Sequence, residues 1–547
     1  MMQPLLSRSA DFQWWKHGVI YQVYLRSFQD SNGDGVGDLA GLIARLDYLT
    51  GLGVDAIWLS PIFSSPMADF GYDVADHTAV DPLFGDLAVF RELVSQVHSR
   101  GLKIILDYIP NHTSEQHAWF LESRASRTAA KRDWYVWRDP GPGGGAPNNW
   151  RGEFGGSAWS WDEPTGQYYY HAFLPSQPDL NWRNPAAARA MLNVLRFWLD
   201  EGVDGFRVDA IHHLLEDESL ADNPPNPQWR EAMGPAEQFL KVHTVDQPEV
   251  HPFIAAMRRL VEGYGADRVL IGEAYLPIPR LMAYYGGALD GFHLPFNFHL
   301  MTTPWTPLAL ASLIGAYEAA LPAGGWPNWV LSNHDRSRLA SRLGEDQARV
   351  AAMLLLTLRG TPTLYQGDEL GLTDVPIPPD RVRDPWELNV PGLGLGRDPA
   401  RTPMLWSGAP NAGFSAQAPW LPLSEGWRDL NAARQLERPG SILRLYQALL
   451  ALRRREEVLQ VGDYALLGAA GGLLAFQRSC PESCLAVVLD LEGSGGVFPL
   501  DGGQILLSTL PGRVGERLES DLHLSPHEGA IVRRCPERQN VGERQNA

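Results

Sequence analysis

The most constraining feature of the sequence is one rhythm repeated eight times: a short β-branched or aromatic run followed by a segment with helical periodicity. Apolar strands that alternate with amphipathic helices are typical of a parallel sheet in the α/β class. Eight such units predict a closed (β/α)8 TIM barrel, whereas a doubly wound open sheet typically has about six strands. The predicted strands are 19–28, 56–62, 103–109, 205–211, 269–275, 291–298, 329–335 and 361–366. The predicted helices include 39–52, 87–100, 186–201, 252–264 and 338–358.

Three segments depart from this rhythm. The connection after the third strand is rich in Gly, Pro, Trp and Asn and far longer than a usual loop, which predicts an inserted subdomain over the barrel mouth. A Pro-rich insertion, 372–401, follows the eighth strand, and short alternating runs after a predicted helix at 441–455 predict a C-terminal antiparallel β domain. The predicted boundaries are 1–107 and 185–459 for the barrel, 108–184 for the inserted subdomain, 460–535 for the β domain and 536–547 for a flexible tail.

Charge and composition limit the classes of partner that the chain is expected to bind. The chain has 46 Lys and Arg against 64 Asp and Glu, a net charge of −18, which argues against nucleic acid and anionic membranes. No secretory signal or membrane-spanning stretch is recognisable, so a cytoplasmic protein is expected, as a monomer or small homo-oligomer. Cys480, Cys484 and Cys535 have neither disulfide-framework nor zinc-site spacing and are predicted to be buried free thiols. The 19 Trp residues are compatible with a carbohydrate pocket.

Chemistry-bearing side chains cluster at the ends of the predicted strands. In this kind of barrel, catalytic groups project from the carboxyl ends of the strands, so these side chains are expected to meet at one mouth. Arg207 precedes Asp209 by two residues, which places both side chains on the same side of the strand. The strand ends contribute His112, Arg207, Asp209, Glu273, His334 and Asp335.

Each of these strand ends resembles, nearly residue for residue, a short motif of the α-amylase superfamily of glycoside hydrolases. The resemblance runs in order from about residue 14 to 406. It implies that Asp209 is the nucleophile, Glu273 the general acid/base and Asp335 the transition-state stabiliser. It also assigns a set of residues to the subsite that holds the cleaved glucose: His112, Arg207 and His334.

The chemistry of the reaction fits these roles. Glycosidic cleavage passes through an oxocarbenium-like state flanked by two carboxyl groups, one ionised and one protonated. The Arg207 guanidinium is expected to keep Asp209 ionised, as a nucleophile requires. Glu273 needs surroundings that raise its pKa.

Further segments resemble the same family. Residues 71–73 resemble the segment that stacks on and hydrogen-bonds the terminal glucose, which implies roles for Tyr72 and Asp73. Arg401 matches an arginine that helps to seal this subsite in exo-acting members. Residues 177–181 resemble the signature of the oligo-1,6-glucosidase and α-glucosidase subgroup, and residues 221–225 are like those of bacterial α-glucosidases.

A loop after the first predicted strand has the spacing of a cation site. Oxygen-bearing side chains stand at positions 1, 3, 5 and 9, and position 7 offers a backbone carbonyl, as at the start of an EF-hand loop. The bidentate Glu of position 12 is replaced by Gly41, so a site of lower charge is expected, and the loop resembles one that binds Ca²⁺ or Mg²⁺ in similar glucosidases. A structural Ca²⁺ or Mg²⁺ is predicted; the alternative is a metal-free Asx-rich turn. The predicted ligands are Asp30, Asn32, Asp34, Val36 and Asp38.

These observations favour an exo-acting, retaining α-glucosidase that hydrolyses terminal α-glucosidic bonds of short substrates such as maltose, with possible transglucosylation. Ala210 follows the predicted nucleophile where α-1,4-specific relatives often have Ala or Thr, which favours α-1,4 over α-1,6 bonds. An oligo-1,6-glucosidase and a sucrose- or trehalose-converting isomerase of the same superfamily remain alternatives. A non-catalytic transporter-associated homologue is a remote one, since such proteins lose the carboxylates kept here.

Overall fold

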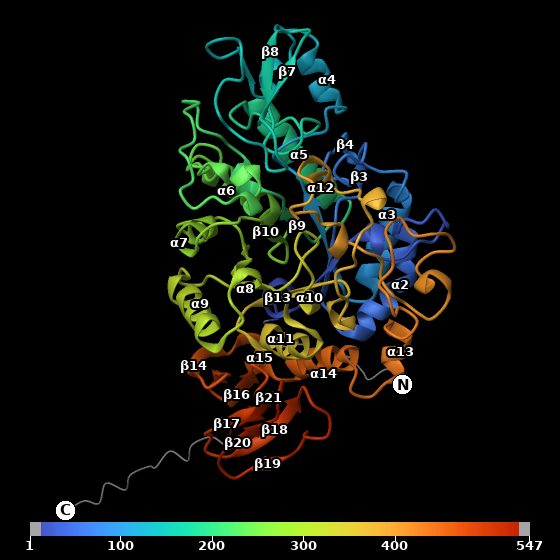
Figure 1. Ribbon diagram of the computed structural model, residues 1–547, viewed down its shortest axis with the longest axis vertical. Coiled ribbons are helices and arrows are strands. Elements are labelled where there is room, and N and C mark those ends of the chain that lie inside the picture. Colours follow the sequence, from blue (N-terminus) through green and yellow to red (C-terminus); the bar gives the residue numbers. More distant parts are fainter. Residues whose placement is uncertain (1–11, 535–547) are drawn as a thin grey trace, which may run out of the picture.

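The computed structural model describes residues 12–534, and its centre is a closed parallel barrel (Figure 1). The strand order is β1-β13-β12-β11-β10-β9-β5-β2, which confirms the predicted (β/α)8 architecture. Each strand overlaps one predicted run. The bounds are Ile20–Val23 (β1), Ala56–Leu59 (β2), Lys103–Tyr108 (β5), Gly205–Val208 (β9), Val269–Gly272 (β10), Leu294–Asn297 (β11), Asn328–Val330 (β12) and Thr361–Tyr365 (β13).

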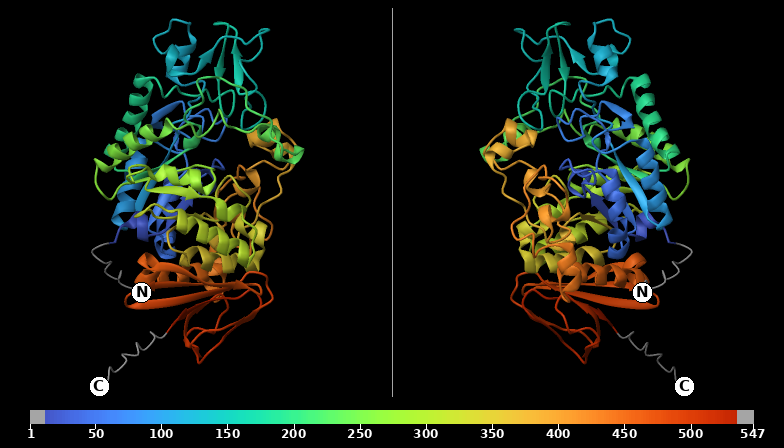
Figure 2. Two further views of the ribbon diagram at one scale, coloured as in Figure 1. Left: turned by 90° about the vertical axis from the view of Figure 1, so that its left-hand side faces the viewer. Right: turned by 90° about the vertical axis from the view of Figure 1, so that its right-hand side faces the viewer.

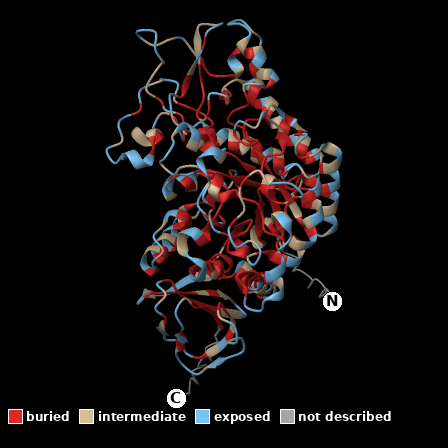
Figure 3. Cartoon of the chain, turned by 45° about the vertical axis from the view of Figure 1, so that its right-hand side comes forward, coloured by how far each residue is buried: buried red, intermediate tan, exposed pale blue. Residues whose placement is uncertain are grey.

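Helices surround the barrel, and the barrel strands are buried on both faces (Figure 3). Alternate strand residues form two apolar clusters, because successive side chains of a strand point to opposite faces. The predicted helix 338–358 is divided at Gly344, whose φ of 83° cannot continue a helix. The main helices are Leu39–Leu52 (α2), Leu87–Ser99 (α3), Pro185–Asp200 (α5), Val250–Glu262 (α6), Pro307–Ala320 (α9), Leu339–Leu343 (α10) and Glu345–Thr357 (α11). Short helices are Trp14–His17 (α1), Ile278–Leu281 (α7), His299–Thr302 (α8) and Pro385–Asn389 (α12).

A small antiparallel sheet stands over the barrel mouth, within the predicted inserted subdomain. Its order is β6-β8-β7, and α4 (Ala118–Arg124) packs beside it. The strands are Trp137–Arg138 (β6), Trp159–Asp162 (β7) and Gln167–Tyr170 (β8). An additional hairpin that was not predicted, Phe63–Ser64 (β3) with Asp76–Val80 (β4), follows β2.

The C-terminal part forms the predicted antiparallel β domain at the opposite end of the molecule from the inserted sheet (Figure 2). Helices Ala432–Glu437 (α13), Ile442–Arg455 (α14) and Glu457–Val461 (α15) lead into it. The six-stranded sheet contains Asp463–Ala470 (β14), Leu473–Cys480 (β15), Ser483–Asp490 (β16), Gly529–Arg533 (β21), Gly503–Ser508 (β18) and Arg517–Leu518 (β19), and a two-stranded sheet contains Gly496–Phe498 (β17) and Leu522–Leu524 (β20).

Two further predictions concern the cysteines and membrane spans. Cys480 and Cys484 are free, as predicted, but both are partly exposed rather than buried, because they flank the β15–β16 turn. Cys535 and the predicted tail 536–547 lie outside the described residues. Within residues 12–534, no helix is both long and apolar enough to cross a bilayer.

Candidate active site

The carboxyl ends of the barrel strands surround a cavity of about 430 Å³. Asp209 follows β9, Glu273 follows β10 and Asp335 stands five residues beyond β12, so parallel topology alone brings three carboxyl groups to one mouth. The predicted residues that line the cavity are Tyr72, His112, Asp209, Glu273, His334 and Asp335.

Arg207 contacts the carboxyl groups of both Asp209 and Glu273. Its side chain is 1% exposed; Nη1 donates to Asp209 Oδ1 at 2.6 Å and to Asp107 Oδ1 at 2.8 Å. Its Nη2 lies 2.8 Å from Glu273 Oε2, which also accepts from the Ala210 backbone N–H at 2.9 Å. One planar guanidinium therefore holds Asp209 and Glu273 side by side.

Burial and charge set different pKa values for this pair. Burial raises the pKa of Glu273 to about 8; Arg207 opposes the shift, and the nearby Asp209 and Asp335 charges add to it. Burial also raises the pKa of Asp209, to about 7, so Arg207 does not by itself keep this carboxyl strongly acidic as expected from sequence. On lowering the pH from alkaline values, Glu273 takes up a proton before Asp209. Asp209 is accordingly the better nucleophile and Glu273 the better acid.

Asp335 is held ionised by its neighbours. Its Oδ1 accepts from Arg401 Nη2 at 2.8 Å and lies 3.5 Å from Arg397 Nη1, and its Oδ2 lies 3.3 Å from His334 Nε2. Burial works against the charged form, but His334, Arg401 and Arg397 together hold the pKa of Asp335 well below its usual range. A permanent negative charge here suits stabilisation of a positively charged transition state.

Tyr72, His112 and His334 lie in the cavity lining. The Tyr72 hydroxyl bonds Asp107 Oδ2 at 3.0 Å and His334 Nε2 at 2.7 Å, and the two rings stack with 5.5 Å between centroids. His112 Nε2 lies 3.1 Å from the Tyr72 backbone oxygen. Buried neighbours thus fix all three rings.

Asp73, Arg207 and Arg401 contact residues that line the cavity. Asp73 accepts hydrogen bonds from the backbone of Ala68 and Asp69, so it shapes the loop that carries Asp69. Arg401 is fully buried and donates to Asp335 and to the His334 backbone oxygen. None of the three belongs to the cavity lining.

An ion pair that sequence reasoning missed lies in the cavity lining. Arg397 Nη2 donates to Asp69 Oδ1 at 2.6 Å and to Asp384 Oδ1 at 2.7 Å, and both Asp69 and Arg397 line the cavity. Arg397 stands four residues before Arg401, and Asp69 stands two residues before the segment 71–73 that supplied Asp73. Their nearness to predicted residues was the available signal; which charged side chain faces the cavity depends on loop geometry.

Most of the remaining lining comes from loops that sequence reasoning did not bring together. Phe154 and Phe173 belong to the inserted subdomain, and Trp386 to the insertion after β13. The remaining members are Glu153, Ala210, His212, His213, Glu237, Lys241, Val245, Tyr275 and Arg336.

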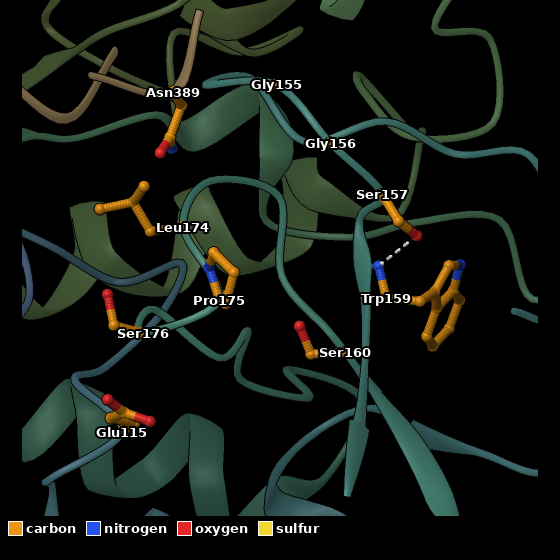
Figure 4. A pocket seen from close by; sticks show the side chains of 10 residues that line it. All are labelled: Glu115, Gly155, Gly156, Ser157, Trp159, Ser160, Leu174, Pro175, Ser176 and Asn389. Carbon is orange, nitrogen blue, oxygen red and sulfur yellow. Dashed lines mark hydrogen bonds between the residues drawn. The ribbon is translucent and has the colours of Figure 1, made fainter. Parts of the chain in front are cut away.

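A second hollow, of about 610 Å³, is lined by none of the predicted site residues (Figure 4). It is lined by Gly155, Gly156, Ser157 and neighbouring residues of the inserted subdomain, with Asn389 from α12. The Ser157 hydroxyl accepts from the Trp159 backbone N–H at 3.1 Å.

The predicted cation loop is held by its own hydrogen bonds. Asp30 Oδ1 accepts from the backbone of Asn32 and Gly33, and Asp38 Oδ1 accepts from Gly41 and so caps α2. Every predicted donor is an oxygen, which suits a hard cation. In the part of the chain that the structure describes, no three His, Cys, Asp or Glu side chains are grouped so as to hold a metal ion. Cation binding therefore stays a prediction.

Comparisons with known proteins identify a matching family and similar chains. Residues 22–462 match the family described as the alpha amylase catalytic domain. The chain is 42% identical to a probable alpha-glucosidase of Rhizobium meliloti over 86% of this chain and 88% of that protein. It is 38% identical to an oligo-1,6-glucosidase of Parageobacillus thermoglucosidasius over 95% and 99%.

Two solved structures have the same fold throughout. An alpha-glucosyl transfer enzyme, XgtA, superposes with a TM-score of 0.90 at 40% identity and covers 96% of this chain and 100% of its own. The trehalulose synthase of Pseudomonas mesoacidophila superposes with a TM-score of 0.87 at 33% identity, over 95% and 99%.

Proposed function

The chain belongs to the alpha-amylase family, whose members include glycoside hydrolases, and from that membership we propose that it is an exo-acting, retaining α-glucosidase. The substrate is a short α-glucoside such as maltose, from which a terminal non-reducing glucose is released. The observation that carries the proposal is the shared Arg207 guanidinium, which holds Asp209 and Glu273 side by side while their pKa values are ordered for nucleophile and acid.

The reaction follows from this arrangement. Asp209 attacks the anomeric carbon, the bond to the leaving oxygen breaks, and Glu273 donates its proton to that oxygen. In the second half, Glu273 takes a proton from water, whose oxygen displaces Asp209 and leaves glucose in the original α-configuration. Asp335, fixed as an anion by Arg401, stabilises the positive charge that develops in both steps.

The Asp69–Arg397 ion pair lies in the cavity lining, where we expect it to block the extension of a longer substrate chain, and this supports exo-action on short substrates. The relatives include oligo-1,6-glucosidases, and the structural neighbours include a trehalulose synthase and an alpha-glucosyl transfer enzyme. Ala210 in the lining favours α-1,4 bonds. In transfer, an alcohol takes the place of water: its oxygen displaces Asp209 from the glucosyl ester formed in the first step, and Glu273 takes its proton.

We also infer a structural Ca²⁺ or Mg²⁺ in the loop formed by residues 30–38, from its oxygen donors. When bound, the cation supplies a fixed positive charge there and takes no part in the cleavage, since this loop precedes α2 and none of its residues lines the cavity. A cytoplasmic location and a monomeric or small homo-oligomeric state are proposed from the sequence alone.

Product analysis tests the proposed activity. The protein is incubated with maltose, isomaltose, sucrose and trehalose at equal concentrations, and the products are separated by chromatography. We expect glucose to appear fastest from maltose. Faster cleavage of isomaltose indicates the oligo-1,6-glucosidase alternative, and conversion of sucrose or maltose to an isomer indicates an isomerase. No glucosyl release from any substrate overturns the proposal.

A further inference from the structure

The hollow of about 610 Å³ in the inserted subdomain is bordered by the same short segments as the catalytic cavity, but the two linings have no residue in common. Each of three segments places an aromatic side chain in the cavity lining and a nearby residue in the lining of the hollow. Two of these segments run side by side, since the Glu153 backbone N–H donates to the Ala172 backbone oxygen at 2.8 Å. The pairs are Phe154 with Gly155, Phe173 with Leu174, and Trp386 with Asn389. The hollow is therefore a separate space next to the catalytic cavity.

The lining of the hollow combines several hydrogen-bonding groups with an apolar surface. Pro175, Leu174 and Trp159 supply the apolar surface, and Figure 4 shows how the side chains surround the hollow. The polar members are Glu115, Ser157, Ser160, Ser176 and Asn389. Among the described residues that line the hollow none is cationic, which disfavours an anionic ligand. Pockets of about 300–1,000 Å³ with this mixture are typical of small-molecule sites, so a ligand of disaccharide size fits.

Two of the serine hydroxyls offer complementary hydrogen bonds. Burial lowers the pKa of His171 to about 4, so its ring is neutral, and its Nδ1 donates to the Phe173 backbone oxygen at 3.1 Å. The Nε2 atom of His171 must then accept from the Ser160 hydroxyl at 2.9 Å, which leaves the Ser160 oxygen as an acceptor for a ligand. The Ser157 oxygen accepts from the Trp159 backbone N–H, so its hydroxyl proton is left to be donated. The hydroxyl groups of a sugar need both kinds of partner.

The other polar side chains of the hollow are not engaged elsewhere. Glu115, Ser176 and Asn389 make no side-chain hydrogen bond to another residue within the described part of the chain. The Glu115 backbone N–H donates to the Ser176 backbone oxygen at 2.8 Å, which holds these two residues together. A carboxylate accepts from two neighbouring hydroxyl groups, and an amide both donates and accepts. These groups suit a ligand with many hydroxyl groups.

We propose that this hollow is a second, non-catalytic binding site, and that its ligand is a neutral sugar of one or two rings. Glu115 and Ser160 accept hydrogen bonds from the sugar hydroxyl groups, Ser157 donates one, and the ring packs on Pro175. The inference goes beyond the proposed function, because none of these residues lines the cavity in which the glycosidic bond is cleaved.

Equilibrium dialysis with radiolabelled maltose counts the binding sites. Asp209→Asn is the background, because maltose then binds without being cleaved, and we expect two molecules of maltose per chain at saturation. Ser157→Trp in this background places an indole in the hollow and should reduce the number to one. Glu115→Ala removes a charged acceptor and should weaken the second site about tenfold. Ser126→Trp, at an exposed position of the same subdomain outside both linings, is the matched control and should keep two.

The number of bound molecules separates this inference from the α-glucosidase proposal. One molecule that is still bound by Ser157→Trp overturns the site in the hollow and leaves the catalytic cavity as the maltose site. One molecule that is lost in Ser157→Trp supports the hollow and contradicts maltose as the ligand of the catalytic cavity. Two molecules in both hollow variants, with unchanged affinity, also overturn the inference, and no binding contradicts both proposals. If Ser157→Trp does not fold, the affinity of Glu115→Ala decides.

Discussion

At the scale of single residues, the central feature is an imbalance of charge around Arg207. One guanidinium contacts three carboxyl groups, those of Asp107, Asp209 and Glu273, in a site where none is more than 7% exposed. Burying several like charges is costly, so such a cluster retains a proton that separate carboxyl groups would lose. This physical reason explains how Glu273 stays protonated near neutral pH.

The pH dependence of kcat/KM should therefore be bell-shaped. Asp209 must be ionised, so activity rises with pH through its pKa of about 7; Glu273 must be protonated, so activity falls through its pKa of about 8. The measurement is kcat/KM for 4-nitrophenyl α-glucoside from pH 5 to 10. Glu273→Gln should lose the alkaline limb. A maximum near pH 4, where isolated carboxyl groups titrate, would contradict these assignments.

Ala210, which we propose sets the linkage preference, has unusual backbone geometry. Its φ of 44° and ψ of 34° are left-handed, a conformation that β-branched residues strongly avoid. Ala210→Val should shift the kcat/KM ratio from maltose toward isomaltose, since added methyl groups in a pocket change discrimination by about 1–3 kcal/mol. It should also lower the melting temperature. Ala210→Gly, which relieves the backbone, should retain the preference for maltose; an unchanged ratio in the Val variant refutes the argument.

At the scale of elements, the strands and most helices were predictable because their patterns are local. Apolar runs matched all eight barrel strands, and the α2 bounds agree with the prediction to the residue. The division between α10 and α11 was missed because the apolar pattern continues across Gly344. The short strands β17, β19 and β20 exist through sheet pairing rather than through local preference, so sequence alone did not indicate them.

The loop between β1 and α2 carries the prediction about a cation. A ligand that binds only the native state stabilises it by about 2.7 kcal/mol at a hundredfold excess over Kd. Exhaustive chelation should therefore lower the melting temperature, and Ca²⁺ or Mg²⁺ should restore it. Asp34→Ala should abolish this dependence, whereas Asp86→Ala, which removes the cap of α3, should lower stability and preserve it. An unchanged melting temperature after chelation, together with no bound cation by elemental analysis, would contradict the proposed cation site.

At the scale of the whole molecule, the site was partly predictable because barrel topology gathers the strand ends. Asp209, Glu273 and Asp335 needed only the strand order to be brought together. The Asp69–Arg397 pair and the wall formed by Glu153 and Lys241 depend on how separate loops fold over the mouth. No local pattern encodes contacts between such distant loops, so the sequence indicated the side chains at the strand ends but not much of the lining that encloses them.

The C-terminal domain is joined to the barrel by a buried arginine. Arg478 on β15 donates to the carbonyl oxygens of Thr357, Leu459 and Gly462 and has no carboxylate in its hydrogen bonds. Arg478→Met should leave these carbonyls unpaired and cost roughly 3 kcal/mol or more. The melting temperature should fall by several degrees with kcat/KM unchanged at 25 °C, and Arg517→Met on exposed β19 should change neither. Equal melting temperatures of the Arg478→Met and Arg517→Met variants would contradict the role of Arg478 in joining the domain to the barrel.

The most direct test of the account is the configuration of the first-formed product. If Asp209 attacks and Glu273 donates the proton, glucose leaves with its anomeric configuration retained, and the two carboxyl groups stand about 5–5.5 Å apart. Proton NMR of maltose hydrolysis, recorded before mutarotation, follows the anomer released from the non-reducing end, with Asp209→Asn as the inactive blank. The account predicts α-glucose first; β-glucose first would contradict both the assigned roles and the retaining mechanism.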